Sequence, residues 1–366
     1  PGGTDYHRLL EAGSASQARV RQGVIAAAAG EDEQPGVLAA RGATVLATAR
    51  TDDKARAACE GLGGAIPLAC ELSEPKSVRA CAEAAAEHGP LDALILNAGI
   101  MALPESTVKH GQELQLLTNH VGHFILLTEL LDRGALSDRA RVVVLSSGAH
   151  HGAPDEGIRF DDLSFERGGY TAWSAYGQSK LANLLFAKQL TKRFEGTGRT
   201  ANAVHPGVIA TNLGRHMPLV ARIAMPIASA IAMKSIPQGA ATQTYVATHP
   251  SLEGVSGEYF ADCNVAKPSR HARDAAMAER LWDVTEQIVA ACAAPAAPPA
   301  NIQSLRPTAN WRMAHSPRSL SSCRHPPWRK AVAAWGGGGG GGGGGARGGR
   351  GGGRGGGQPE TMAGAG

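Results

Sequence analysis

The sequence predicts an α/β domain in which a doubly wound parallel sheet lies between two layers of helices. Its strand segments are apolar throughout, and they alternate along the chain with segments of helical periodicity. Strands of that kind are typical of a parallel sheet that is buried on both faces. Polar residues follow directly after several of these strands, and the ligand crevice of a doubly wound sheet lies at the carboxyl ends of its strands. We therefore expect a small-molecule site at that edge.

The expected elements follow in regular order from residue 37. Continuous apolar runs such as 91–96 (LDALIL) indicate strands, and apolar residues three and four apart indicate helices. Strands are expected at 43–49, 64–70, 91–96, 141–146, 200–204 and 258–261. Helices are expected at 52–62, 74–87, 108–132, 174–194, 238–248 and 272–290. These elements define one domain, residues 37–290.

The two ends of the chain differ from this domain. Residues 291–366 are dominated by Ala, Pro, Gly, Ser and Arg, with an unbroken glycine run at 336–345, so we expect a disordered, low-complexity tail. Residues 1–36 form a degraded segment. Residues 24–29 are apolar enough for a short strand, but the acidic run 31–33 and Pro35 interrupt any helix that follows.

Composition excludes several classes of protein. The 366 residues carry a net charge of +4, part of it from the tail, so no basic nucleic-acid-binding face is expected; an RNA-contacting Arg-Gly tail is the weaker alternative. The six cysteines show no CxxC spacing, which suits a reducing compartment. The histidine pairs 120/123 and 150/151 lack companion ligands, and no metal site is expected. No run is apolar enough to span a membrane, so we expect a cytoplasmic or organelle-associated protein.

Tyr176 and Lys180 suggest proton-transfer chemistry. In the expected helix 174–194 they are four residues apart and so share a face. A neighbouring ammonium favours the phenolate, and we expect it to lower the pKa of Tyr176 from its ordinary value near 10. The pair would then donate and accept a proton near neutral pH.

Six motifs carry a resemblance to a known family. They are LILNAG (94–99), TNHVGHF (118–124), VVVLSSGAH (142–150), AYGQSKLANLLFAKQL (175–190), ANAVHPGVIATNL (201–213) and GVSGEYFADCNVAKPS (254–269). In this order they resemble the short-chain dehydrogenase/reductase family, in particular the group of retinol dehydrogenases, WW-domain oxidoreductases and plastid Tic32-like proteins. The similarity spans Val37 to Val289 and implies a Rossmann-type fold.

The resemblance implies a role for each matching residue. Tyr176 would be the catalytic acid and base, Lys180 would lower its pKa, and Ser147 would orient the substrate carbonyl. Asn119 would hold a water that connects Lys180 to solvent. A nicotinamide cofactor would lie along Arg50, Glu71, Leu72, Asn97, Ala98, Gly99, Tyr176, Lys180, Pro206, Ile209 and Thr211.

The end of the first clear strand indicates which cofactor. An acidic residue there would bind the ribose 2′-hydroxyl of NAD(H), whereas an arginine accommodates the 2′-phosphate of NADP(H). The segment ends in Arg50 and has no acid before Asp52, so NADP(H) is favoured over NAD(H). Arg50 as an ordinary surface arginine is the alternative.

One departure from the family concerns the phosphates of the cofactor. The TGxxxGxG turn after the first strand is absent, and the central first strand is expected to be missing or degraded. Three explanations stay open, in order of preference: a misassigned first exon, an adequate substitute formed by 24–30, or a non-catalytic member. We accordingly expect weak NADPH binding.

The functional expectation is an oxidoreductase that transfers a hydride between NADP(H) and the carbonyl or alcohol of an apolar, retinoid-like or otherwise lipophilic substrate. The alternative is a catalytically inactive homologue that acts as a binding or scaffold protein. The apolar segment 217–236 would form a core helix pair, a lid over an apolar substrate, or a patch that contacts a membrane surface. Oligomers are compatible with the sequence.

Overall fold

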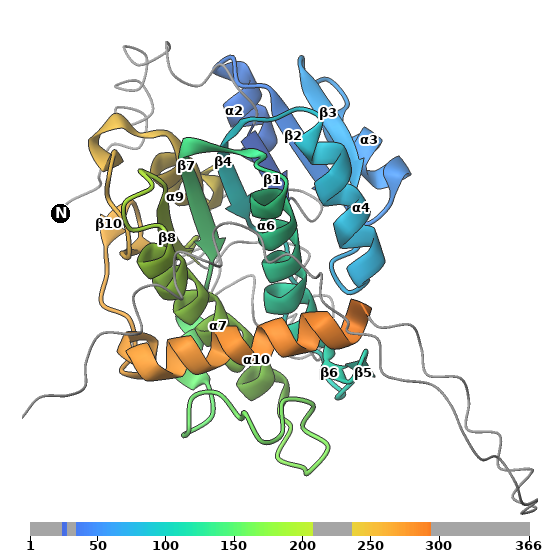
Figure 1. The fold of residues 1–366 in the computed structure, drawn as a ribbon, viewed down its shortest axis with the longest axis vertical. Helices are drawn as coiled ribbons and strands as arrows, with labels where there is room; N and C mark the ends of the chain where they lie inside the picture. The colour runs from blue at the N-terminus through green and yellow to red at the C-terminus, as the bar shows by residue number, and fades with distance from the viewer. Residues whose placement is uncertain (1–23, 28–33, 208–235, 294–366) are drawn as a thin grey trace, which may run out of the picture. The chain divides into compact units, whose positions relative to one another are not determined.

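The computed structural model describes residues 24–27, 34–207 and 236–293 (Figure 1). These residues belong to one compact unit. The segments that lie outside the described residues include the apolar insertion 217–235 and almost all of the expected tail.

An eight-stranded sheet forms the middle of this unit, in the order β10-β9-β8-β7-β4-β1-β2-β3. Every neighbouring pair is parallel except β9 and β10. The strands are β1 Val24–Ala27, β2 Val45–Ala49, β3 Ala65–Ala69, β4 Leu91–Leu96, β7 Leu136–Leu145, β8 Thr200–His205, β9 Tyr259–Ala261 and β10 Asn264–Val265. The doubly wound α/β fold class is confirmed.

Helices connect the strands and cover the sheet. The main helices are α2 Gln34–Ala40, α3 Asp52–Cys59, α4 Pro75–Ala86, α6 Gly122–Asp132, α7 Ala172–Arg193, α9 Ile236–Thr248 and α10 Ala275–Ala293. On one side α4 packs against α6, and α10 packs across α7, as the long orange helix of Figure 1 shows. Helices α2 and α9 contact each other, and α9 lies over β4, β7 and β8.

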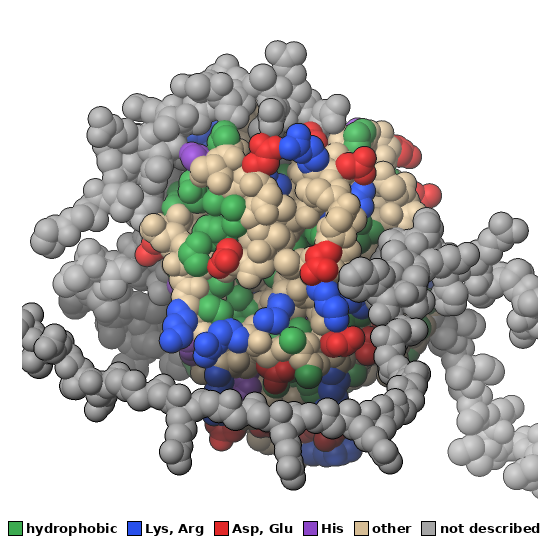
Figure 2. All heavy atoms as spheres, turned by 60° about the vertical axis from the view of Figure 1, so that its left-hand side comes forward, with side chains coloured by type: hydrophobic (Ala, Val, Ile, Leu, Met, Phe, Trp, Pro, Cys, Tyr) green, Lys and Arg blue, Asp and Glu red, His purple; other side chains and the backbone are tan. Residues whose placement is uncertain are grey.

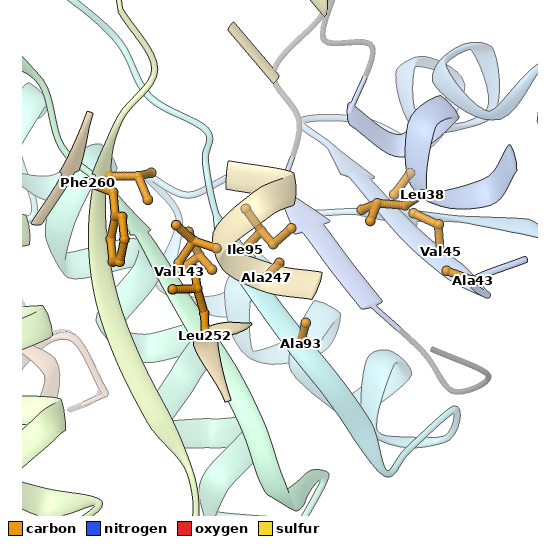
Figure 3. Close-up of a cluster of buried hydrophobic side chains, with 12 residues drawn as sticks. Leu38, Ala43, Val45, Ala93, Ile95, Val143, Ala247, Leu252 and Phe260 are labelled. Carbon is orange, nitrogen blue, oxygen red and sulfur yellow. The ribbon is translucent and has the colours of Figure 1, made fainter. Parts of the chain in front are cut away.

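The hydrophobic core beneath α2 and α9 explains why the central strands are apolar throughout. Figure 3 shows Ile95 of β4 and Val143 of β7 next to Ala247 of α9, with Phe260 of β9 and Leu38 of α2 at the two ends of the cluster. All five side chains are buried. Burial on this face, together with the helices on the other, makes apolar side chains favourable along the central strands.

The first strand is present, contrary to the expectation of a missing strand. Val24–Ala27 pairs in parallel with β2 and with β4, in the middle of the sheet. Helix α2 begins at Gln34, so Pro35 lies in its first turn, where a proline is tolerated because the N–H there has no intrahelical partner. The expectation that Pro35 prevents this helix is therefore wrong, and the domain begins before the expected limit of 37. Residues 28–33, where the glycine-rich turn would occur, lie outside the described residues.

The segment 108–113 also differs from expectation. A long helix was expected from 108, but Val108–Lys109 (β5) and Gln112–Glu113 (β6) form an antiparallel hairpin. Its two-residue loop has φ of 50° at His110 and 74° at Gly111, the left-handed pair that suits tight hairpins. Helical structure begins only at Leu114, with the short helix α5, Leu114–Leu116.

Smaller differences lie at element ends. Strand β7 begins at Leu136 rather than 141, and β10 was not expected. Helix α10 extends to Ala293, beyond the expected limit of 290. Among the described helices, none is long and apolar enough to cross a membrane.

Candidate active site

The candidate site lies at the carboxyl ends of β4, β7 and β8. Asn97 follows β4, Ser146 and Ser147 follow β7, and Pro206 follows β8. Helix α7 packs against β7 and β8 and presents its first turns to the same edge (Figure 1). The structure thus brings together the strand ends that the sequence singled out.

The Ser147 side chain lies close enough to the Tyr176 phenol to oppose the rise in the pKa of that phenol. Tyr176 is 7% exposed, near the start of α7. Ser147 has extended backbone and caps the 3₁₀ helix η3, Gly148–Gly152, with its Oγ accepting from the Ala149 N–H at 3.2 Å. A buried phenol and a partly buried hydroxyl in contact are a pair of donors that can act together on one carbonyl oxygen.

Lys180 follows Tyr176 one helical turn later. Its Nζ lies 5.7 Å from the centroid of the Tyr176 ring and donates to the Leu145 carbonyl oxygen at 3.3 Å. The same oxygen accepts from Asn183 Nδ2 at 2.8 Å. Burial of the ammonium lowers the pKa of Lys180 to about 8.

The pKa of Tyr176 corrects one expectation. The sequence predicted a value lowered by Lys180, but burial raises the pKa of Tyr176 to about 12, and the hydrogen bond from Ser147 only partly opposes this. Desolvation disfavours the phenolate more than its neighbours stabilise it. In this state the phenol is therefore protonated at neutral pH and can serve as an acid.

Asn119 occupies a π-helical turn, η2 (Leu117–Val121), just before α6. Its side chain binds the backbone of Ile100 in both directions, accepting at Oδ1 (2.8 Å) and donating from Nδ2 (2.9 Å), and Nδ2 also lies 2.9 Å from Ser179 Oγ. Single π turns of this kind are frequent at functional sites. Asn119 thereby ties the loop after β4 to helix α7.

Gly99 shows how closely these groups converge. A Cβ atom at Gly99 would lie 2.8 Å from Asn119 Oδ1 and 3.5 Å from Lys180 Nζ. A side chain at this position would displace Asn119, so the structure brings Gly99, Asn119 and Lys180 close together.

Gly177 is a functional residue that the sequence reasoning missed. A Cβ atom there would lie 2.7 Å from the Ala149 oxygen and 2.8 Å from the Ala153 nitrogen. The absence of a side chain lets η3, and with it Ser147, pack against the start of α7. The glycine inside an otherwise helical AYGQSK run was the available signal.

The predicted cofactor residues that the structure describes follow strands β2, β3, β4 and β8 or lie in helix α7. Arg50 follows β2, is exposed, and has no hydrogen-bond or ion-pair partner among the described residues. Asn97 is buried and its Oδ1 accepts from Gln243 of α9 at 3.3 Å, while Ala98 is half-buried beside it. Pro206 is half-buried after β8; Ile209 and Thr211 lie outside the described residues.

Glu71 and Leu72 form the turn between β3 and α4. Glu71 Oε1 accepts from the Ser73 N–H and hydroxyl at 3.1 and 2.9 Å, so this carboxylate has a structural role in the turn. Leu72 is buried, and its carbonyl oxygen lies where a Cβ atom at Gly122 would collide with it, so the glycine lets α6 approach the turn closely.

The histidine pairs have structural partners. His120 Nε2 contacts Thr285 Oγ1 at 3.0 Å, and His123 Nδ1 contacts the Asn119 oxygen at 3.0 Å; burial lowers the pKa of both rings, to about 4 and about 3. Among the described residues, no three His, Cys, Asp or Glu side chains are placed to share a metal ion.

The residues present fit a nicotinamide dinucleotide on three counts. Gly99 presents only backbone next to Asn119, Lys180 carries a buried amine beside it, and Arg50 presents a cation at the end of β2 that is unpaired within the described part of the chain. The crevice at the carboxyl ends of a doubly wound sheet is where such cofactors bind.

The comparisons with known proteins agree with this geometry. Residues 35–157, which include Asn119 and Ser147, match the family described as short chain dehydrogenase. The chain is 43% identical over 267 residues to short-chain dehydrogenase TIC 32 B, chloroplastic, of Brassica napus, an alignment that covers 69% of this chain and 83% of the relative. The chain belongs to the short-chain dehydrogenase family. It is therefore a member of a family of oxidoreductases.

Two further relatives place this short-chain dehydrogenase among its neighbours. It is 41% identical to human retinol dehydrogenase 14 over 232 residues, which cover 63% of this chain and 68% of the relative. A solved structure of an uncharacterized protein from Mycobacterium paratuberculosis has a TM-score of 0.59 and 34% identity, covering 74% of this chain and 93% of that one. The predicted resemblance to retinol dehydrogenases and their plastid relatives is confirmed.

Proposed function

We propose that this short-chain dehydrogenase transfers a hydride between NADP(H) and the carbonyl or alcohol of a small apolar substrate. The observation that carries the proposal is the buried Tyr176 phenol beside Ser147, with the Lys180 amine one helical turn away. A relative of 41% identity is named a retinol dehydrogenase, and retinol is an apolar alcohol.

In carbonyl reduction, each of these residues has a different role. When bound, the nicotinamide supplies the hydride. Ser147 and Tyr176 donate hydrogen bonds to the carbonyl oxygen, where negative charge develops, and Tyr176 then gives up its proton. The Lys180 ammonium stabilises the phenolate that remains. Asn119 holds the Gly99–Ile100 loop against Lys180 and α7.

Cofactor choice rests on Arg50. Arg50 is exposed at the end of β2 and has no side-chain partner among the described residues, so its guanidinium can form two parallel hydrogen bonds to a 2′-phosphate. The segment after β2 has no carboxylate before Asp52 that could bind a 2′-hydroxyl. NADP(H) is therefore preferred over NAD(H). We also propose a cytoplasmic or organelle-surface location, since one relative is named chloroplastic. We further propose that residues 217–236 contact a membrane surface and that the protein self-associates.

The test is the oxidation of NADPH by the purified full chain with retinaldehyde and medium-chain aldehydes, and the reverse reaction with the matching alcohols. Tyr176→Phe should abolish turnover in both directions while NADPH binding and circular dichroism stay unchanged, because only one hydroxyl is lost. A variant that keeps near-normal rates would show that Tyr176 is not the acid. A wild-type chain that folds and binds NADPH but turns over none of these substrates would favour the scaffold alternative.

A further inference from the structure

A cavity of about 410 Å³ lies beside the active site, between η3 and the segment that joins β10 to α10. Its walls come from residues 150–155 on one side and residues 267–273 on the other. These two segments are far apart in sequence, and the fold brings them together at the left of the sheet in Figure 1. Neither segment has a role in the mechanism proposed above.

The cavity lining is rich in cations. Lys267, Arg270 and Arg273 line it, against one carboxylate, that of Asp155. All four are exposed. Figure 2 shows Lys and Arg side chains gathered low on the face that is brought forward from the left of Figure 1. A concave surface with an excess of one charge attracts ligands of the opposite charge.

These cations have unused hydrogen-bonding capacity. The side chains of Lys267 and Arg273 have no hydrogen-bond or ion-pair partner among the described residues. Arg270 is held in place, since its Nε donates to His271 Nε2 at 3.2 Å and its guanidinium reaches the Asp155 backbone oxygen at 3.5 Å. Within the part of the chain that the structure describes, no carboxylate forms an ion pair with any of the three. Arginine and lysine in this state suit carboxylate and phosphate oxygens.

His150 connects this cavity to the active site. Its Nδ1 lies 2.6 Å from the Ser147 backbone oxygen and its Nε2 accepts from the Ser269 N–H at 3.1 Å. The His150 ring therefore connects Ser147 of the candidate active site to the segment 267–273 that carries the three cations. His151, which stacks on His150 with ring centroids 4.1 Å apart, lines the same cavity.

We propose that this cavity binds the carboxylate or phosphate group of a small molecule next to the hydride-transfer site. Three cations supply the charge, Arg270 supplies a fixed guanidinium, and the cavity is large enough for such a group. The anion is either the acidic end of the substrate or a separate small anion that acts on Ser147 through His150. The binding of an anion in this cavity does not depend on the proposed hydride transfer. Only the choice between a substrate group and a separate anion rests on the proposed function.

A titration that needs no turnover tests the site. Inorganic phosphate is added to the full chain at constant ionic strength, and the imidazole proton signals of His151 and His271 are followed by NMR. Saturable shifts are expected, and the triple variant Lys267→Gln, Arg270→Gln, Arg273→Gln should weaken the affinity by about tenfold or more. The control is Lys76→Gln, Arg139→Gln, Lys192→Gln, which removes the same charge from exposed positions outside the cavity. Equal affinity in all three proteins, or no saturation, overturns the proposal.

A kinetic comparison then identifies the source of the anion. With NADPH, 4-carboxybenzaldehyde and benzaldehyde are compared in the wild type and the cavity variant. A rise in KM of about tenfold for the carboxylated aldehyde alone assigns the cavity to the substrate. A response of the benzaldehyde rate to phosphate that the cavity variant loses assigns it to a separate anion. If neither kinetic effect accompanies the binding, its link to the active site is wrong. Loss of all turnover in the wild type would bear on the proposed function and leave the titration result standing.

Discussion

Gly177 packs directly against the backbone of Ala153, so closely that a Cβ atom at Gly177 would lie 2.8 Å from the Ala153 nitrogen. The residue before Gly177 is Tyr176, the proposed acid, and the loop that ends at Ala153 begins at Ser147. The distance between the two hydroxyls therefore depends on a contact that only glycine allows.

The first prediction follows from this contact. Gly177→Ala should lower kcat by about a hundredfold, because η3 must move away from α7 and misplacement of a catalytic group by about 1 Å can cost that much. KM for NADPH should change little. The matched control is Gly152→Ala in the same loop, since nothing lies within 4 Å of a Cβ atom there. Comparable rates in the two variants would contradict the role of Gly177; steady-state kinetics measure both.

The second prediction concerns Lys180, whose burial is unfavourable for stability. Its pKa in the folded state is about 8, below the ordinary value of 10.5, so the unfolded chain binds the proton more tightly between these pH values. Stability should then rise with pH from about 8 to 10.5. Lys180→Met should raise the free energy of unfolding at pH 7 by about 3 kcal/mol while abolishing turnover.

The pH dependence is the check on this assignment. The Leu145 oxygen keeps its hydrogen bond from Asn183 in the variant, so no buried acceptor is left unpaired. The stability gained by Lys180→Met should shrink as pH rises from about 8 and disappear above about pH 11, because Lys180 is then neutral in both states. Urea unfolding at pH 7 and pH 9.5 measures this. A gain that is the same at both pH values would mean that the buried charge is not its cause.

Much of this arrangement could be predicted from the sequence, and the parts that could not have physical reasons. Strand β4 was predicted with its exact ends, since LDALIL is a closed apolar run. The hairpin at 108–113 was not predicted because only two residues, His110 and Gly111, indicate its turn, and their left-handed backbone is known only from the structure. The raised pKa of Tyr176 depends on how deeply the ring is buried, which helical spacing does not report. The three cavity cations lie in one segment, 267–273, but the cavity forms only where the fold brings this segment to 150–155, which sequence spacing does not report.

The third prediction concerns His150. Its ring accepts from Ser269 N–H at Nε2, so Nδ1 carries the proton that it donates to the Ser147 oxygen, and burial lowers the pKa of the ring to about 4, which keeps it neutral. His150→Phe removes both links and should lower kcat by about tenfold through a misplaced Ser147. His150→Gln, whose amide can still donate and accept, should recover much of the rate. Equal losses in Phe and Gln would indicate that the ring's volume, rather than its hydrogen bonds, is what matters.

The fourth prediction tests cofactor preference. Arg50→Ala should weaken NADPH binding by about ten- to a hundredfold, the value of one to two charge-assisted hydrogen bonds, and leave NADH binding unchanged. The control is Arg56→Ala, because that exposed arginine is already paired with Asp52 at 2.7 Å. Fluorescence titration with both dinucleotides gives the four affinities needed. An Arg50→Ala chain that loses NADPH and NADH binding equally would place Arg50 outside the 2′-phosphate site.

The last prediction concerns the connection between β1 and α2. Strand β1 ends at Ala27 and α2 begins at Gln34, so residues 28–33 join a central strand to the next helix, which is where a doubly wound fold binds the pyrophosphate. The sequence places no glycine-rich turn there but three carboxylates, Glu31, Asp32 and Glu33. Like charges repel, and the phosphates of NADPH carry several negative charges. We therefore expect NADPH to bind this chain more weakly than it binds relatives with the turn, and the triple variant Glu31→Gln, Asp32→Asn, Glu33→Gln to bind about tenfold more tightly.

A second triple variant separates local repulsion from a general effect of net charge. Glu83→Gln, Glu87→Gln, Asp132→Asn removes the same charge from exposed positions in or directly after helices α4 and α6 and should leave the NADPH affinity unchanged. Micromolar or tighter binding by the unaltered chain would show that the β1–α2 connection already makes a working phosphate site. Since β1 is in its place at the centre of the sheet, the strand itself cannot be the cause of weak binding. The carboxylates and the missing glycines would then be the remaining causes, and the first triple variant measures the share of the carboxylates.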